Sequence, residues 1–173
     1  MAKIFAITGG HGTGKTSVVN ELEKKGYKFL MEAARWVSEN DFRFKGKNIL
    51  EINKKDFQDA IFDLQKKQIS ELKGDEIVFS DRGIGDTLAY YKIAGLKISD
   101  EKMELAKKFK YEKVFVLDFF NFYQKDKLRQ ESKKEQEKIH NEIVKTYEGL
   151  GYSLIYVPFM SVKKRTRFIL ERI

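Results

Sequence analysis

The chain has 173 residues, of which 42% are hydrophobic and 35% charged, and its formal net charge is +8 at pH 7. This size and composition are typical of one soluble globular domain, so we expect residues 1–173 to form a single domain. The lack of cysteine excludes disulfides and thiolate metal sites, and no apolar run approaches the roughly 20 residues of a membrane span. Because Met1-Ala2-Lys3 shows no signal-peptide pattern, we expect a cytoplasmic protein.

The positive charge leaves two interpretations. It would attract a polyanionic partner such as nucleic acid. Lysine and glutamate are mixed along the chain rather than gathered in one block, however, and this favours a solvated surface. We therefore do not expect a nucleic-acid partner, and the sequence leaves the oligomeric state open.

The first half of the chain predicts strands and helices in alternation. Short apolar runs predict strands, and apolar residues at helical spacing predict helices that glycines end. The expected strands are 4–8, 27–31 and 77–80, and the expected helices are 16–25, 33–39 and 54–73.

The second half continues the alternation, with helical segments over 88–93 and 99–110 and strands over 114–117 and 152–157. Ser132 and Glu135 form a capping-box pattern, which predicts that a helix starts there. Ser161 is expected to cap the last helix. Five short apolar strands separated by helices predict a parallel sheet covered on both faces, the three-layer α/β/α class.

A glycine-rich stretch between the first strand and first helix is the most specific motif. Its pattern, Gly9-x-x-x-x-Gly14-Lys15-Thr16, is that of a phosphate-binding loop. Glycines let the backbone wrap an anion, and the N–H groups and the helix N-terminus then point at it. The residues expected to bind the nucleotide here are Gly9, Gly10, His11, Gly12, Thr13, Gly14, Lys15, Thr16 and Ser17.

Within this loop, Lys15 is expected to reach the β- and γ-phosphates, and the Thr16 hydroxyl to coordinate Mg²⁺. His11 either touches phosphate or fills a permissive position, and the second interpretation is favoured. The sequence assigns no particular role to Ser17.

A second metal ligand is expected at the carboxyl end of a strand. Two strands end in aspartate, at Asp81 and at Asp118. Asp81 is favoured because Arg82 follows it and supplies a fixed cation for phosphate. Asp118 is interpreted as a turn residue at the strand end.

The segment Asn53-Lys54-Lys55-Asp56 matches the tetrapeptide with which GTPases recognise guanine. It opens the long helix, however, where Asn53 is expected to be the N-cap and Asp56 an acid of the first turn. Position 84, where a GTPase would have glycine, is Ile84. We therefore interpret the segment as a helix cap.

At this point the chain resembles the small P-loop kinases, and specifically the NadR/Ttd14-type AAA-like ATPase domain family, from about residue 3 to the C-terminus. The resemblance rests on short motifs in matching order: residues 7–16, Gly26-Tyr27, residues 32–35, residues 80–83, residues 126–129 and residues 147–152. It implies a five-stranded parallel sheet of order 2-3-1-4-5. It also implies ATP, with GTP possible, together with Mg²⁺ and phosphoryl transfer to a small nucleoside-like or other metabolite alcohol.

On the acceptor side of the site, Glu32 is expected to activate the acceptor hydroxyl, as the corresponding acid does in nucleoside kinases. The alternative is a carboxylate that caps the helix at 33. Arg35 either binds the acceptor or is a surface residue of that helix without a role in binding. Trp36 is interpreted as a core residue of an amphipathic helix rather than as a platform for a substrate base.

The charged segment 119–134 lies where these kinases carry a lid, and Arg129 would reach the transferring phosphoryl group from it. The alternative for Arg129 is a solvated arginine. Pro158 follows the last strand, where the adenine would lie, but it also fits a simple turn.

The leading hypothesis is an ATP-dependent kinase with Lys15, Glu32, Asp81 and Arg129 as catalytic residues. Arg35 and Arg82 would bind substrate beside Glu32, and Thr16 and Asp81 would hold the metal. The alternative is a nucleotide-binding switch or slow NTPase that acts through a partner.

Overall fold

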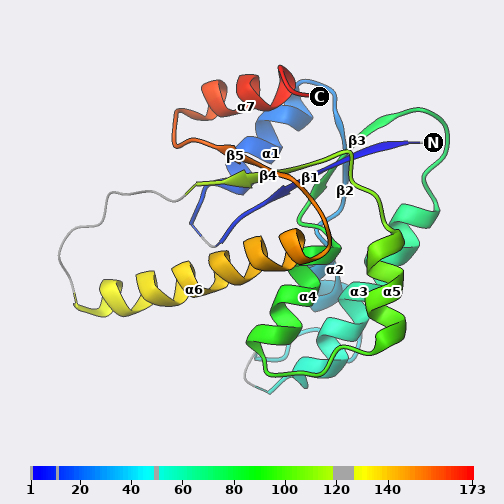
Figure 1. Ribbon diagram of the computed structural model, residues 1–173. Coiled ribbons are helices and arrows are strands. Elements are labelled where there is room, and N and C mark those ends of the chain that lie inside the picture. The colour runs from blue at the N-terminus through cyan, green and yellow to red at the C-terminus, as the bar shows by residue number, and fades with distance from the viewer. Residues whose placement is uncertain (1, 11, 49–50, 119–126) are drawn as a thin grey trace.

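A five-stranded parallel sheet of order β2-β3-β1-β4-β5 forms the centre of the computed structural model (Figure 1). The structure describes residues 2–10, 12–48, 51–118 and 127–173, and for 127–133 it describes the backbone alone. The five parallel strands and their order confirm the expected fold class and strand order. No helix in the described part of the chain is long and apolar enough to cross a membrane.

Strands and helices alternate through most of the chain. The strands are β1 (Lys3–Thr8), β2 (Lys28–Leu30), β3 (Ile77–Asp81), β4 (Lys113–Leu117) and β5 (Leu154–Val157). The helices are α1 (Lys15–Lys24), α2 (Ala33–Asn40), α3 (Lys54–Ser70), α4 (Ile84–Ile93), α5 (Asp100–Lys108), α6 (Lys127–Gly149) and α7 (Val162–Leu170).

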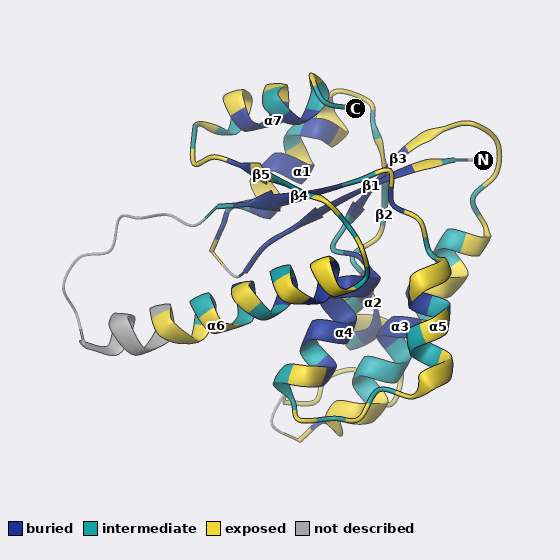
Figure 2. Cartoon of the chain, viewed as in Figure 1, coloured by how far each residue is buried: buried dark blue, intermediate teal, exposed yellow. Residues whose placement is uncertain are grey.

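The helices cover the two faces of the sheet unequally. Helices α1 and α7 lie on one face, and α2 to α6 lie on the other (Figure 1). Because successive strand residues point to opposite faces, Phe5 and Ile7 of β1 pack with α1 and α7, whereas Ile4 and Ala6 pack with α4 and α6. The central strands are therefore buried on both sides, as Figure 2 shows in dark blue.

The long helix α6 begins earlier than the sequence suggested. It starts at Lys127, so Ser132 lies inside the helix, and its expected role in a capping box is wrong. The segment 127–134 contains no glycine or proline, and most of its residues are good helix formers, so nothing in it stops the helix.

Two other expected caps have different outcomes. The side chain of Asn53 accepts hydrogen bonds from the backbone N–H groups of Lys55 and Asp56, which confirms that the GTPase-like tetrapeptide is a helix cap. Ser161 occupies the N-cap position of α7 as expected, but its side chain makes no capping hydrogen bond.

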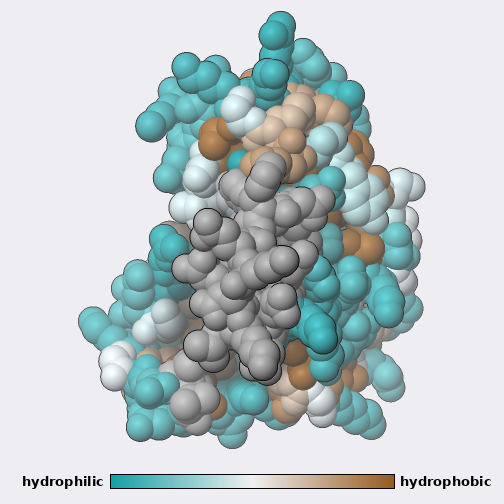
Figure 3. All heavy atoms as spheres, turned by 90° about the vertical axis from the view of Figure 1, so that its left-hand side faces the viewer, coloured by the Kyte–Doolittle hydropathy of each residue, from teal (hydrophilic) through white to brown (hydrophobic). Residues whose placement is uncertain are grey.

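One face of the molecule, seen in Figure 3, is largely hydrophilic. On the face shown in Figure 3 most of the coloured atoms are hydrophilic, and apolar atoms form smaller groups among them. This distribution is that of a solvated surface.

Candidate nucleotide and acceptor site

The glycine loop connects β1 to α1 and has the backbone that only glycine adopts readily. Gly9 has φ 137°, and a Cβ on it would lie 2.9 Å from the carbonyl oxygen of Leu117 in β4. Gly14 has φ 80° and is the N-cap of α1. The loop therefore curves back against the sheet and directs the N-terminus of α1 toward its own concave side.

Lys15 lies over this loop and is buried. Its Nζ donates hydrogen bonds to the carbonyl oxygens of Gly9, at 3.0 Å, and Gly10, at 3.3 Å. Burial, reinforced by the charge of Arg82, lowers the pKa of Lys15 to about 8, while the nearby carboxylates oppose this shift. An anion in the loop would favour the charged ammonium further.

Arg165 of α7 holds the loop, a contact that no local pattern in the sequence predicts. Its side chain is buried, and Nη1 donates a 2.7 Å hydrogen bond to the carbonyl oxygen of Thr13. A Cβ on Gly14 would lie 3.0 Å from Nη2 of the same guanidinium. In a trans peptide the C=O and the following N–H point in opposite directions, so this bond polarises the Gly14 N–H on the other side.

His140 of α6 contacts the same loop. Its Nδ1 accepts a 3.2 Å hydrogen bond from the backbone N–H of Gly10, which requires that Nδ1 carry no proton. Burial lowers the pKa of His140 and thus favours this neutral form. In sequence, His140 looks like one polar residue in a charged helix, and its partner lies 130 residues away.

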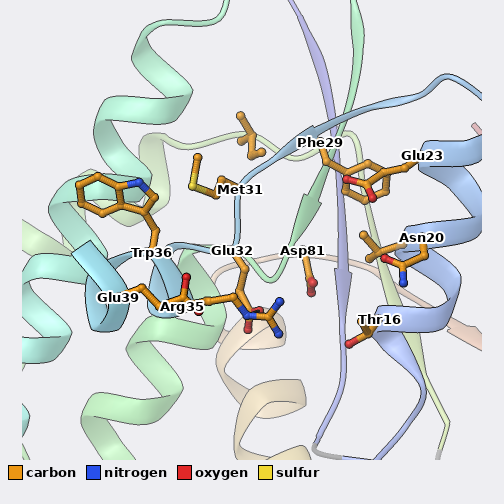
Figure 4. Close-up of a pocket in the computed structure, with 12 residues that line it drawn as sticks. Thr16, Asn20, Glu23, Phe29, Met31, Glu32, Arg35, Trp36, Glu39 and Asp81 are labelled. Carbon is orange, nitrogen blue, oxygen red and sulfur yellow. Dashed lines mark ion pairs between the residues drawn. The ribbon is translucent and has the colours of Figure 1, made fainter. Parts of the chain in front are cut away.

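Asp81 ends β3 and lies with Thr16 at the mouth of the loop (Figure 4). Its Oδ1 is buried and has no hydrogen-bond partner within the described residues. Burial, followed by the repulsion from Glu32, raises the pKa of Asp81 to about 6. A carboxylate oxygen with no partner, beside a hydroxyl, fits a Mg²⁺ ion whose other ligands are phosphate oxygens and water.

The described residues contain no group of three or more His, Cys, Asp or Glu side chains that could hold a metal ion alone. This finding is compatible with the fit of Mg²⁺ at Thr16 and Asp81, because Mg²⁺ in phosphoryl-transfer sites usually takes only one or two protein carboxylates.

Asp86 in α4 organises a buried network that the sequence did not indicate. Its carboxylate accepts hydrogen bonds from the Thr8 hydroxyl at 2.6 Å, the Tyr147 hydroxyl at 2.8 Å and the Gly83 N–H at 2.9 Å. Nη1 of Arg82 donates to it at 3.3 Å. The network fixes Arg82, whose φ of 65° is the only positive value of a non-glycine residue in the described chain.

Glu32 occupies the N-cap position of α2, but its side chain makes no capping hydrogen bond. The carboxylate instead lies between two arginines, 3.6 Å from Nε of Arg82 and 3.7 Å from Nε of Arg35. The capping alternative for Glu32 is therefore wrong, and the structure brings Glu32 to the same place as Asp81 and both arginines.

Trp36 does not belong to the core, so its interpretation as a core residue is wrong. The buried residues of α2 are Ala33 and Val37, four positions apart on one side, while Trp36 is 37% exposed. It lines a cavity of about 370 Å³ together with Glu32, Arg35, Thr16 and Asp81 (Figure 4). Because Trp36 is the only tryptophan in the sequence, tryptophan fluorescence should respond to a ligand in this cavity.

A second cavity, of about 540 Å³, shares Glu32 with the first. Residues of α2, α3, α4 and α6 line it, and Arg82 and Asp86 lie in its wall. The second cavity therefore borders the hydrogen-bond network that holds Arg82.

Several expected site residues have less to connect them to this centre. Pro158 is exposed just after β5, and Asp118 is half-buried at the end of β4. His11 and residues 119–126 of the expected lid lie outside the described residues, as does the side chain of Arg129, whose backbone is in α6.

A parallel sheet with a glycine loop between β1 and α1, and an aspartate at the end of the neighbouring β3, defines a P-loop protein. The model of the AAA domain family matches residues 4–165, and the chain belongs to that family. Its fold is that of the P-loop NTPases.

Solved structures with the same fold include several kinases. A NadR protein in complex with NR has a TM-score of 0.69 and 18% identity, and the match covers 98% of this chain and 49% of that one. The chain thus spans about half the length of that NadR chain. Thymidylate kinase from Ehrlichia chaffeensis has a TM-score of 0.61 and 13% identity, with 98% and 97% covered.

Deoxyadenosine kinase from M. mycoides has a TM-score of 0.59 and 15% identity, with 98% and 97% of the two chains covered. No curated protein matches the chain. At these identities the likeness establishes the fold, and the site's own residues must carry any argument about function.

Proposed function

We propose that this protein binds a nucleoside triphosphate, ATP or GTP, with Mg²⁺ and transfers its γ-phosphoryl group to a small nucleoside-like or other metabolite alcohol. The observation that carries this proposal is the convergence of Lys15, Asp81 and Glu32 at the mouth of the glycine loop. The charges of Asp81, Glu32 and Arg82 all act on the Lys15 ammonium, so these groups share one site.

Each group has a defined part in the transfer. The loop N–H groups and Lys15 bind the β- and γ-phosphates. Thr16 and Asp81 would hold Mg²⁺, which when bound neutralises charge on the phosphates. Arg82, fixed by Asp86, would supply a positive charge near the γ-phosphoryl group, and Arg35 would bind the acceptor. Arg129 would add a second cation from the segment 119–134.

Glu32 supplies the base. The acceptor hydroxyl oxygen forms a bond to the γ-phosphorus as the bond from that phosphorus to the β,γ-bridging oxygen breaks, and the nucleoside diphosphate leaves. The hydroxyl proton passes to the Glu32 carboxylate and then to water. Glu32 and Asp81 line the same cavity, which supports this division of roles between base and metal ligand.

The test is release of ADP or GDP measured with and without a panel of small alcohols. A kinase releases the diphosphate at least about tenfold faster when the correct acceptor is present, because the acceptor completes the transfer geometry. Uniformly slow release across a broad panel, together with tight nucleotide binding, would instead support the alternative of a regulatory switch or slow NTPase.

A further inference from the structure

The peptide between Gly9 and Gly10 in the glycine loop is held from both sides. Its carbonyl oxygen, which belongs to Gly9, accepts a 3.0 Å hydrogen bond from Nζ of Lys15. Its N–H group, which belongs to Gly10, donates a 3.2 Å hydrogen bond to Nδ1 of His140. The C=O and N–H of a trans peptide point in opposite directions, so one planar unit connects the Lys15 ammonium to the imidazole of His140.

The orientation of this peptide depends on its hydrogen-bond partners. Both of its residues are glycines, so no side chain restricts its rotation. The following carbonyl, that of Gly10, is held within the loop, because the Thr13 hydroxyl donates to it at 3.0 Å and Lys15 donates at 3.3 Å. The N–H of Gly10 has its acceptor on α6 instead, 130 positions along the chain. The contact that fixes this N–H therefore comes from outside the loop.

The two side chains that the peptide connects are both buried. Lys15 and His140 are each 8% exposed. Burial is the largest effect on the pKa of His140 and lowers it, and the charge of Lys15 lowers it as well. The carboxylates of Asp118 and Asp86 oppose this shift. Lys15 and His140 are therefore close enough to influence each other, with the peptide between them.

Hydrogen bonds that share one peptide strengthen each other where water is excluded. Donation from the Gly10 N–H to His140 increases the negative charge on the Gly9 carbonyl oxygen, and this strengthens its bond to the Lys15 ammonium. Without His140, the buried N–H would lose its acceptor, and the peptide could turn toward another one. The Gly9 carbonyl would then no longer hold the ammonium.

The Lys15 ammonium has three N–H donors, so it can keep one on the Gly9 carbonyl while the others meet phosphate oxygens. We infer that His140 is a positioning residue, which acts through the Gly9–Gly10 peptide to hold Lys15 in place for the β- and γ-phosphates. The inference rests on the proposed function, because it takes this loop as the site of the triphosphate.

The first experiment removes the acceptor on α6 and then restores it. Affinity for a non-hydrolysable ATP analogue with Mg²⁺ is measured by calorimetry for the parent chain, His140→Leu and His140→Asn. Leucine cannot accept the Gly10 N–H, and we expect a loss in affinity of about tenfold. The carboxamide oxygen of asparagine can replace Nδ1, so His140→Asn should stay within about threefold of the parent chain. Equal losses in the two variants, or no loss in His140→Leu, overturn the inference.

Asn141→Leu is the matched control, because Asn141 is the next residue of α6 and is exposed. It should leave affinity for the analogue unchanged. A loss equal to that of His140→Leu would mean that α6 affects binding in a general way, and it would overturn the inference. If His140→Leu does not fold, His140→Phe, which also lacks an acceptor, takes its place.

A double-mutant cycle tests whether His140 acts through Lys15. The melting temperatures of the parent chain, His140→Leu, Lys15→Met and the double variant are compared without nucleotide, so the cycle does not depend on weak binding. Because one peptide joins the two groups, the changes should depart from additivity by at least about 2 °C. Additive changes would mean that the two side chains act separately, and they would overturn the inference.

The outcomes separate this inference from the proposed function. If the parent chain does not bind the analogue, the proposed function fails, and the role of His140 in binding fails with it. If the parent chain binds the analogue and His140→Leu binds it equally well, the proposed function stands and the inference alone fails. A loss in His140→Leu that His140→Asn restores, together with a non-additive cycle, supports the inference.

Discussion

The guanidinium of Arg165 donates a hydrogen bond to the carbonyl oxygen of Thr13, across 152 positions of the chain. This bond connects the last helix to the glycine loop and lies on the loop's outer side, opposite the Gly14 N–H. Through it, α7 stiffens the loop and strengthens a donor that the proposed phosphate site uses.

Replacement of this arginine should therefore weaken phosphate binding. We predict that Arg165→Met lowers affinity for inorganic triphosphate and for ATP about tenfold or more, with Arg165→Lys intermediate, measured by calorimetry. Arg167→Met is the control, since Arg167 is on the same helix but is exposed and paired with Glu171. A purely structural role would instead lower the melting temperature and leave triphosphate affinity of the folded protein intact.

The raised pKa of Asp81 predicts a pH dependence of stability. The folded pKa of about 6 exceeds the ordinary value of 3.8, so between pH 4 and 6 the folded state binds more protons than the unfolded state. Stability of the nucleotide-free protein should therefore fall as pH rises through this window, by up to about 2–3 kcal/mol.

Asp81→Asn should remove that loss, so that the variant is more stable than the parent protein at pH 7 in urea unfolding. It should also lose the effect of Mg²⁺ on nucleotide affinity. Asp118→Asn, at the end of β4, is the matched control and should retain both behaviours. Should Asp118→Asn alone abolish the Mg²⁺ effect, the metal ligand would be Asp118.

Glu32→Gln tests the proposed base. The amide keeps the size of the side chain but cannot take the acceptor proton, so ADP release with an acceptor should fall by about 10²-fold or more. Affinity for ATP should change little. The exposed Glu101→Gln on α5 serves as the control. Turnover equal to that of the parent protein would rule out Glu32 as the base.

Asp86→Ala should be the most destabilising of these changes. It leaves the buried Tyr147 and Thr8 hydroxyls and the Arg82 guanidinium without their shared acceptor. We expect a loss of about 3–5 kcal/mol, equivalent to roughly 10 °C in melting temperature for a chain of this size. Asp63→Ala, at an exposed position of α3, should change the melting temperature little.

Local patterns predicted the features of this protein that depend on neighbouring residues. The glycine loop, the aspartate at the end of β3 and the cap at Asn53 follow from signals that lie within a few residues of one another, where the physics of helix starts and strand ends operates. The strand order was instead implied by the family resemblance.

The network behind the site could not be predicted in this way. Asp86 meets Tyr147 across 61 positions, His140 meets Gly10 across 130, and none of these pairs has a local pattern. The assignment of Trp36 to the core was wrong because neighbouring positions on a helix point in directions that differ by about 100° about the helix axis. Ser132 was misplaced because a capping-box pattern also occurs inside helices whose other residues favour helix.

The central claim is that the glycine loop binds the polyphosphate of a nucleoside triphosphate. The most direct test is calorimetric titration of the protein with Mg²⁺ and a non-hydrolysable ATP or GTP analogue, for the parent chain and for Lys15→Ala. The account predicts saturable binding of one analogue per chain and a loss of at least about 100-fold in affinity in the variant. No binding to the parent chain, or equal affinity in Lys15→Ala, would contradict it.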